Sequence, residues 1–153
     1  MGVSQSIITP YKGAEIIAIP RGVYSDIIKH IKSEYPMIAL GILVGLFQKN
    51  HAIVFHTVKL KNIKPSLDNY AMDEKEWMRR IQEANNLGLK YIGIYHSHRG
   101  SANPTQYDIQ KMRECPGEIF LIIHAKKNKI IDIRAWKYGE NGKGLTEVKI
   151  LRI

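Results

Sequence analysis

One strand–loop–helix segment constrains the fold of this chain most strongly. Residues 90–95 are apolar enough for a buried strand, and His96 and His98 follow at its end. Side chains two positions apart on a strand point to the same face, so the two imidazoles are expected to lie together. After a loop of turn-forming residues, Thr105 begins a helical stretch with Asp108 in its first turn. Two histidines and a carboxylate, with a fourth position left for water, form a recurrent ligand set of catalytic zinc. The spacing is therefore compatible with a metal site.

Each part of this segment also has an ordinary structural interpretation. A histidine at the end of a strand is often a surface or hydrogen-bonded residue. Thr105 followed three positions later by Asp108 is typical of a capping arrangement, in which the hydroxyl and the carboxylate accept from free N–H groups of the helix. Asp108 would also complement the positive end of that helix. The spacing alone leaves capping and metal ligation open.

The rest of the chain alternates strand-like and helix-like segments without repeats or low-complexity stretches. Tyr24, Ile27 and Ile31 recur at helical spacing, and Pro36 follows the segment they define. We expect helices over residues 23–34, from Asp73 to Gly88 and from Thr105 onward, with a polar loop over residues 61–72. We expect strands over residues 15–19, 38–47, 52–60, 90–95, 118–125, 130–138 and 145–151. This order predicts one α/β domain over residues 1–153, with a mixed central β-sheet flanked by helices.

The His96-Ser97-His98 pair, the short loop and Thr105-Gln106-Tyr107-Asp108 together resemble the signature of the JAMM zinc metalloproteases, the catalytic branch of the MPN domains. In that signature both histidines and the aspartate bind zinc, and Thr105 stands at the position of the family's serine, so it keeps the hydroxyl. The loop is one residue shorter than is usual in the family. The resemblance extends over nearly the whole chain and implies an MPN, cytidine-deaminase-like fold, a Zn²⁺ cofactor and a ubiquitin-like protein or protein conjugate as substrate. Many members pair up, which leaves a homodimer open.

One departure from the family bears directly on activity. The family's catalytic glutamate stands two residues after a proline that follows the first helix, and this chain has Pro36-Met37-Ile38 there. Ile38 therefore occupies the glutamate position and cannot accept a proton. A placed acid–base group is typically worth about 10²- to 10⁴-fold in rate. Glu34 or Glu118 could replace it only by reaching the site from a neighbouring segment.

Composition narrows the environment and the partners. A single cysteine, Cys115, excludes an internal disulfide and favours a reducing cytoplasm. No secretory signal is evident, and no apolar run approaches the about 20 residues that span a bilayer, so we expect no membrane partner. The net charge of +9 comes from scattered lysines and arginines, and no basic patch carries the interleaved aromatic residues that stack on bases. We therefore expect no nucleic-acid partner.

Three functions of different classes follow from these observations. The first is a zinc isopeptidase that removes ubiquitin-like modifiers, supported by the metal motif and opposed by Ile38. The second is a non-catalytic zinc-binding MPN scaffold, which Ile38 favours, although scaffold members of the family usually lose the metal ligands as well. The third is a nucleic-acid-associated protein, which only the charge supports.

Overall fold

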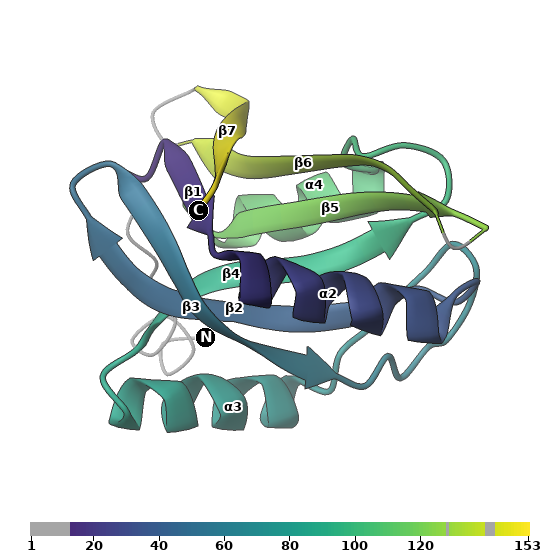
Figure 1. The fold of residues 1–153 in the computed structure, drawn as a ribbon, viewed down its shortest axis with the longest axis horizontal. Coiled ribbons are helices and arrows are strands. Elements are labelled where there is room, and N and C mark those ends of the chain that lie inside the picture. Colours follow the sequence, from purple (N-terminus) through teal and green to yellow (C-terminus); the bar gives the residue numbers. More distant parts are fainter. Residues whose placement is uncertain (1–12, 128, 140–142) are drawn as a thin grey trace.

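The structure is a computed structural model, and it describes residues 13–127, 129–139 and 143–153. Within these residues three helices accompany seven strands (Figure 1). The helices are α2 (Arg21–Glu34), α3 (Glu74–Asn86) and α4 (Gln106–Glu114). The strands are β1 (Ile16–Ile19), β2 (Leu40–Gln48), β3 (His51–Leu60), β4 (Lys90–His98), β5 (Ile119–Lys126), β6 (Lys129–Gly139) and β7 (Gly144–Arg152). The mixed α/β class expected from the sequence is confirmed.

The sheet differs from the expected flanked sheet because it closes on itself. Its strand order is β1-β3-β2-β4-β5-β6-β7, and the short β1 joins the two ends by pairing in parallel with both β3 and β7. Ile17, for example, is opposite Ala52 on one side and Ile150 on the other. The physical reason is that closure pairs the backbone groups that an open sheet would leave exposed at its edges. The prediction of a flanked sheet was therefore wrong in this respect.

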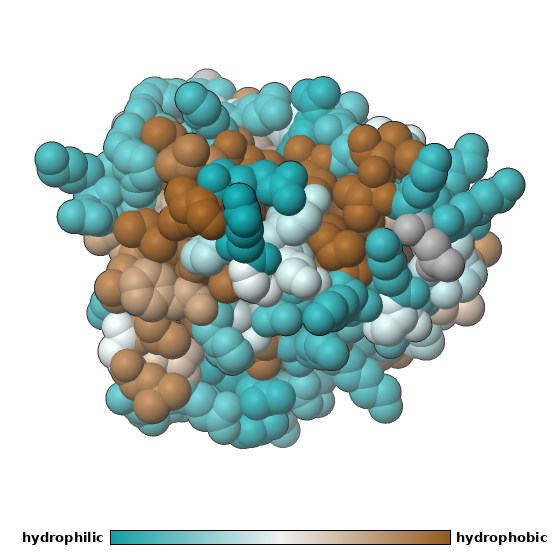
Figure 2. All heavy atoms as spheres, in the orientation of Figure 1, coloured by the Kyte–Doolittle hydropathy of each residue, from teal (hydrophilic) through white to brown (hydrophobic). Residues whose placement is uncertain are grey.

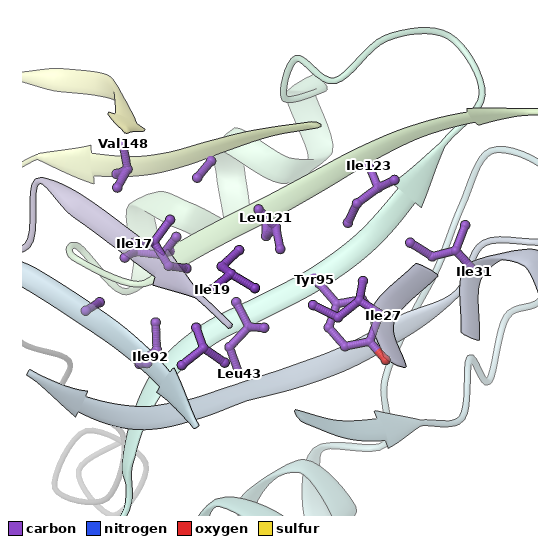
Figure 3. Close-up of a cluster of buried hydrophobic side chains, with 14 of the residues drawn as sticks. Ile17, Ile19, Ile27, Ile31, Leu43, Ile92, Tyr95, Leu121, Ile123 and Val148 are labelled. Carbon is purple, nitrogen blue, oxygen red and sulfur yellow. The ribbon is translucent and has the colours of Figure 1, made fainter. Parts of the chain in front are cut away.

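Two apolar clusters lie on opposite faces of the sheet and are covered by different helices. Along β5 the side chains alternate, so that Leu121 and Ile123 join one cluster and Phe120 and Ile122 join the other. Helix α2 covers the first face (Figure 3). Its Ile27 and Ile31 belong to one cluster with side chains from the strands, among them Ile17, Ile19, Leu43, Ile92 and Tyr95. Helices α3 and α4 contribute Trp77, Ile81, Ala84 and Met112 to the second cluster. Burial on both faces explains why the central strands are almost continuously apolar.

The central strands align the elements that form the motif. Strand β4 pairs antiparallel with β2 and parallel with β5, so that His96 is opposite Leu40 on one side and Ile122 on the other. The backbone N–H of Ala39 donates to Ser97 Oγ at 2.9 Å, which extends the contact beyond β2. Strands β2 and β4 are therefore neighbours, which brings the residues just before Leu40 close to the histidines. Strand β4 runs further than predicted, since the pairing of His98 with His124 keeps both histidines inside the ladder.

The helix ends follow the predicted signals. Asp73 caps α3 by accepting from the N–H of Lys75 at 3.0 Å, and Gly88, with φ of 84°, follows the end of that helix. Thr105 caps α4 in a complete capping box with Asp108. These local signals fix where α4 begins, and therefore fix the first-turn position of Asp108.

The surface is predominantly hydrophilic on the face where α2 lies, with hydrophobic side chains in separate patches (Figure 2). Exposed large hydrophobic residues include Phe55, Ile63, Ile131 and Ile153, each at least half exposed, together with Leu87. Among the described residues, no helix combines the length and the apolar character needed to cross a membrane.

The pairing of β4 with β5 depends on a glycine that precedes the motif. A Cβ at Gly93 would lie 1.8 Å from the carbonyl oxygen of Ile119, so Gly93→Ala forces the two strands apart. We expect this substitution to lower the free energy of unfolding by about 3 kcal/mol or more. Gly22→Ala on α2 is the control, since nothing lies within 4 Å of its added Cβ. Urea denaturation measures both, and a Gly93→Ala variant as stable as Gly22→Ala would contradict the close approach.

Candidate metal centre

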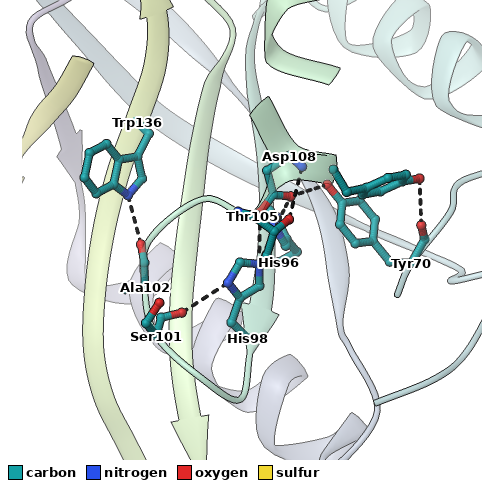
Figure 4. Close-up of polar contacts among 9 residues, drawn as sticks. Tyr70, His96, His98, Ser101, Ala102, Thr105, Asp108 and Trp136 are labelled. Atoms are coloured by element: carbon teal, nitrogen blue, oxygen red, sulfur yellow. Dashed lines mark hydrogen bonds and ion pairs between the residues drawn. The ribbon is translucent and has the colours of Figure 1, made fainter. Parts of the chain in front are cut away.

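Three side chains from two elements converge at the end of the β4–β5 pair (Figure 4). His96 and His98 project from β4, and Asp108 projects from the first turn of α4. The two Nε2 atoms are 3.1 Å apart, and they lie 3.0 and 3.1 Å from the two carboxylate oxygens of Asp108. His96 and Asp108 are fully buried, whereas the His98 side chain is 10% exposed. The predicted juxtaposition of these residues is confirmed, and one side of the cluster remains accessible.

The hydrogen bonds of His98 fix which of its nitrogens can bind a cation. Its Nδ1 lies 3.1 Å from the carbonyl oxygen of Ser101, which can only accept, so Nδ1 carries the proton. In this tautomer the lone pair of Nε2 points to the cluster. Proteins usually orient a metal-binding histidine by a hydrogen bond from its other ring nitrogen to a backbone carbonyl or a carboxylate. His96 has the same Nε2 in the cluster, while its buried Nδ1 has no hydrogen-bond partner among the described residues.

Asp108 combines the two roles that the sequence left open. Its Oδ2 accepts from the backbone N–H of Thr105 at 2.9 Å, and its Oδ1 accepts from the Tyr70 hydroxyl at 2.9 Å. Each carboxylate oxygen has a further lone pair, so capping and ligation are compatible. Burial raises the pKa of Asp108, but its contacts with His96 and His98 and the hydrogen bond from the Thr105 N–H outweigh burial and hold that pKa well below its usual range. The carboxylate is therefore ionised, as a ligand must be.

The donor set fits a zinc ion. Ligands at about 2.0–2.1 Å from a tetrahedral zinc lie about 3.3–3.4 Å from one another. The observed separations of 3.0–3.1 Å are close to that spacing, and the candidate ligand atoms of the three residues all lie within 4.8 Å of one another. Burial lowers the pKa of His96, although Asp108 opposes the shift, so its imidazole is neutral near pH 7 and can act as a ligand.

Thr105 contacts Asp108 directly, whereas Ile38 belongs to the apolar cluster on the same face of the sheet. Thr105 Oγ1 accepts from the N–H of Asp108 at 3.1 Å, which leaves the hydroxyl hydrogen available to donate. Ile38 is 3% exposed and packs in the same apolar cluster as Leu40 and Phe120. Since Leu40 is opposite His96, the Ile38 side chain lies on the face of the sheet that carries the histidine.

Neither alternative acid lies where a base is needed. Glu118 directly precedes Ile119, whereas the residue opposite His96 is Ile122, so about 13 Å of strand separates the two positions at about 3.3 Å per residue. The Glu118 carboxylate accepts from the Tyr91 hydroxyl instead. Glu34 is exposed at the end of α2, which packs on the opposite face of the sheet. Both acids are therefore outside hydrogen-bond reach of the cluster.

Sequence reasoning missed Tyr70. It stands in the polar 61–72 connection, it is 3% exposed, and its ring lies against the ring of His96 with 4.5 Å between centroids. Burial and the charge of Asp108 raise its pKa well above the usual range, so the hydroxyl stays protonated and donates. The available signal was a tyrosine in an otherwise hydrophilic connection, because a tyrosine is stabilised most when its ring is buried and its hydroxyl meets an acceptor.

Comparison with known proteins assigns this arrangement to a family. Residues 20–139 match the model of the prokaryotic homologs of the JAB domain, a span that contains Ile38, Tyr70 and all three converging residues. The chain therefore belongs to this family, which confirms the resemblance to the JAMM and MPN domains.

Two curated proteins are similar in sequence. The probable TtuB-protein conjugate cleaving protease of Thermus thermophilus is 29% identical over 100 residues, which cover 64% of this chain and 64% of that protein. The desampylase of Pyrococcus furiosus is 27% identical over 139 residues, which cover 88% of this chain and 89% of that protein. The chain thus spans just under two-thirds of the first relative and most of the second.

Two solved structures share the fold. A solution structure of a Desulfitobacterium hafniense protein has a TM-score of 0.76 at 22% identity, covering 90% of this chain and 92% of that chain. A Salinibacter ruber protein has a TM-score of 0.66 at 21% identity, covering 89% and 91%.

The buried Glu118 makes stability depend on pH. Burial raises its pKa to about 7, and the Tyr91 hydrogen bond offsets only part of that shift. Because the folded state binds this proton more tightly than the unfolded chain, stability from this group is full below about pH 4.5 and is lost as pH rises through about 7. We expect a loss of about 3 kcal/mol from this group between pH 4.5 and 8.

Glu118→Gln keeps the size and the acceptor for Tyr91 but cannot ionise, so it should be the more stable protein at pH 8 and should lose much less stability across the range. Glu74→Gln, which changes an exposed carboxylate at the start of α3, serves as the control. Urea denaturation at pH 4.5, 6 and 8 provides the measurement. Equal pH slopes for wild type and Glu118→Gln would contradict the assignment.

Proposed function

We propose that this chain is a zinc-dependent isopeptidase-type metallopeptidase that acts on protein conjugates of small ubiquitin-like modifiers in the cytoplasm. The observation that carries the proposal is the convergence of His96 Nε2, His98 Nε2 and the Asp108 carboxylate within 3.0–3.1 Å, with His98 partly exposed. The names of the two curated relatives, a conjugate-cleaving protease and a desampylase, support the substrate class.

The proposed chemistry divides between the cation and the protein. Zinc at this position would polarise the scissile carbonyl and lower the pKa of a coordinated water to about 7. His98, held by Ser101, and Asp108, held by Thr105 and Tyr70, keep their donor atoms fixed without rearrangement. The Thr105 hydroxyl hydrogen can donate to the carbonyl oxygen of the substrate, where negative charge develops.

The site lacks a side chain that could accept and transfer a proton. At the glutamate position of the family the chain has the buried, apolar Ile38, and neither Glu34 nor Glu118 lies within reach. The missing acid–base group is worth about 10²- to 10⁴-fold in rate, so we expect low turnover by the wild-type protein.

A second candidate function rests on the same residue. An MPN scaffold that binds zinc and acts through protein contacts needs the three ligands for structure but no proton acceptor. The tight packing of Ile38 in the apolar cluster favours this alternative. Turnover by the wild-type chain, however small, distinguishes the isopeptidase from the scaffold.

Metal binding is the first test. We expect about one zinc per chain, and Asp108→Ala should abolish binding because it removes a ligand and leaves two histidines. Asp132→Ala, which changes an exposed aspartate paired with Arg134 on β6, should bind as the wild type does. Metal analysis after dialysis measures the stoichiometry. Full zinc content in Asp108→Ala would overturn the assigned ligand set.

Restoring the acid is the second test. Ile38→Glu should raise zinc-dependent cleavage of a ubiquitin-like fusion by about 10²- to 10⁴-fold. The control Ile38→Gln introduces a side chain of the same size as glutamate that cannot take up a proton, so it should leave turnover at the wild-type level. A buried carboxylate is destabilising unless it is paired, and we therefore expect Ile38→Glu to gain more thermal stability from zinc than the wild type gains.

The double variant Ile38→Glu with Asp108→Ala separates metal-dependent cleavage from contaminating activity, because it should lose the gain entirely. Inactivity of every variant with zinc bound throughout would favour the scaffold. Robust wild-type turnover that Glu34→Gln or Glu118→Gln removes would instead show that an acid reaches the site in solution.

A further inference from the structure

Tyr70 contacts both kinds of side chain in the candidate metal centre. Its hydroxyl donates to Asp108 Oδ1 at 2.9 Å, and Asp108 Oδ1 in turn lies 3.0 Å from His96 Nε2. Its ring is tilted 35° against the His96 ring, with 4.5 Å between the centroids. A single buried residue from the 61–72 connection therefore touches a carboxylate from α4 and an imidazole from β4 (Figure 4).

These contacts restrain the rotation of the Asp108 carboxylate and the orientation of the His96 ring, the two motions that would move the ligand atoms apart. A carboxylate can rotate about its last bond, and Asp108 is fixed because each oxygen has its own donor, the Thr105 N–H at Oδ2 and the Tyr70 hydroxyl at Oδ1. The His96 ring lacks a hydrogen bond at Nδ1 among the described residues, so no partner there holds its orientation. The Tyr70 ring on one side and the edge-on Phe120 ring, with centroids 5.7 Å apart, hold it by packing instead.

Tyr70 is itself anchored, so it can transmit this restraint. Its backbone carbonyl accepts from the Tyr107 hydroxyl at 3.0 Å, and the two rings meet edge to face at 5.3 Å. The next residue, Ala71, donates its N–H to Asn62 Oδ1 at 3.0 Å and accepts from the N–H of Ile63 at 2.9 Å. The connection therefore forms a closed loop whose inner end is Tyr70.

We propose that Tyr70 is a positioning residue that orients Asp108 and His96 as ligands and thereby couples the 61–72 connection to the metal centre. The inference rests on the proposed zinc site and goes beyond it, because it assigns a role to a residue outside the His-x-His and Thr-x-x-Asp motif. Partners that orient ligands in this way typically change metal affinity by about 10- to 100-fold when they are removed.

The hydroxyl is tested by Tyr70→Phe, which keeps the ring against His96 and removes the donor to Asp108. We expect its zinc dissociation constant, measured by competition with a chromophoric chelator, to rise about 10- to 100-fold. The matched variant is Tyr107→Phe, which removes a neighbouring hydroxyl but leaves the Tyr70–Asp108 hydrogen bond in place. It should raise the dissociation constant by no more than about threefold, in line with a contact one step removed.

Each result has a defined meaning. A rise with Tyr70→Phe alone supports the positioning role, and a further rise with Tyr70→Leu shows that the ring contributes as well. Zinc affinity of Tyr70→Phe equal to that of the wild type overturns this inference and leaves the metal site intact. Equal losses in Tyr70→Phe and Tyr107→Phe also overturn it, since they would reflect loosening of the connection. Failure of the wild-type chain to bind zinc overturns the proposed function first, and this inference with it.

Discussion

The position of β4 between β2 and β5 is the constraint on which the site depends. Pairing with β2 fixes the path of the strand up to His96, and pairing with β5 fixes it up to His98, so both histidines are held by the sheet and not by a loop. The close approach at Gly93 sets the distance to β5, and the Ser97 hydroxyl joins the strand to the residue after Ile38. Sites built on strands in this way hold donor atoms more precisely than sites on loops.

Asp108 shows how one local arrangement can serve two purposes. The capping box fixes where α4 begins, and the Asp108 carboxylate that completes it also contacts the two imidazoles. Because the backbone N–H of Thr105 occupies one lone pair and the Tyr70 hydroxyl another, the carboxylate is oriented before any cation binds. Preorganisation of this kind reduces the free energy spent on ordering ligands. The same contacts link the helix, the strand and the 61–72 connection into one unit.

Local patterns were sufficient to predict most elements and the three converging residues. The His-x-His spacing, the Thr105 cap and the apolar strands each depend on residues close together in sequence. Closure of the sheet was missed because it depends on β1, a strand of four residues whose two partners come from the middle and the end of the chain. Tyr70 was missed for the same reason, since its partner Asp108 lies 38 positions away. Long-range pairings of this kind leave no periodic signal in the sequence.

Ile38 places stability and catalysis in opposition at one position. An isoleucine there completes the apolar cluster with Leu40 and Phe120, and full burial of such a side chain is worth about 1.5–3 kcal/mol. A glutamate at the same position would give up that burial and would need a cation or a donor to offset its desolvation. The chain has kept the donor atoms, the tautomer of His98 and the ionised Asp108, so ligand orientation and proton transfer are separable here. A substitution that restores the acid therefore alters one step of the chemistry while the restraints on the ligands remain as they are.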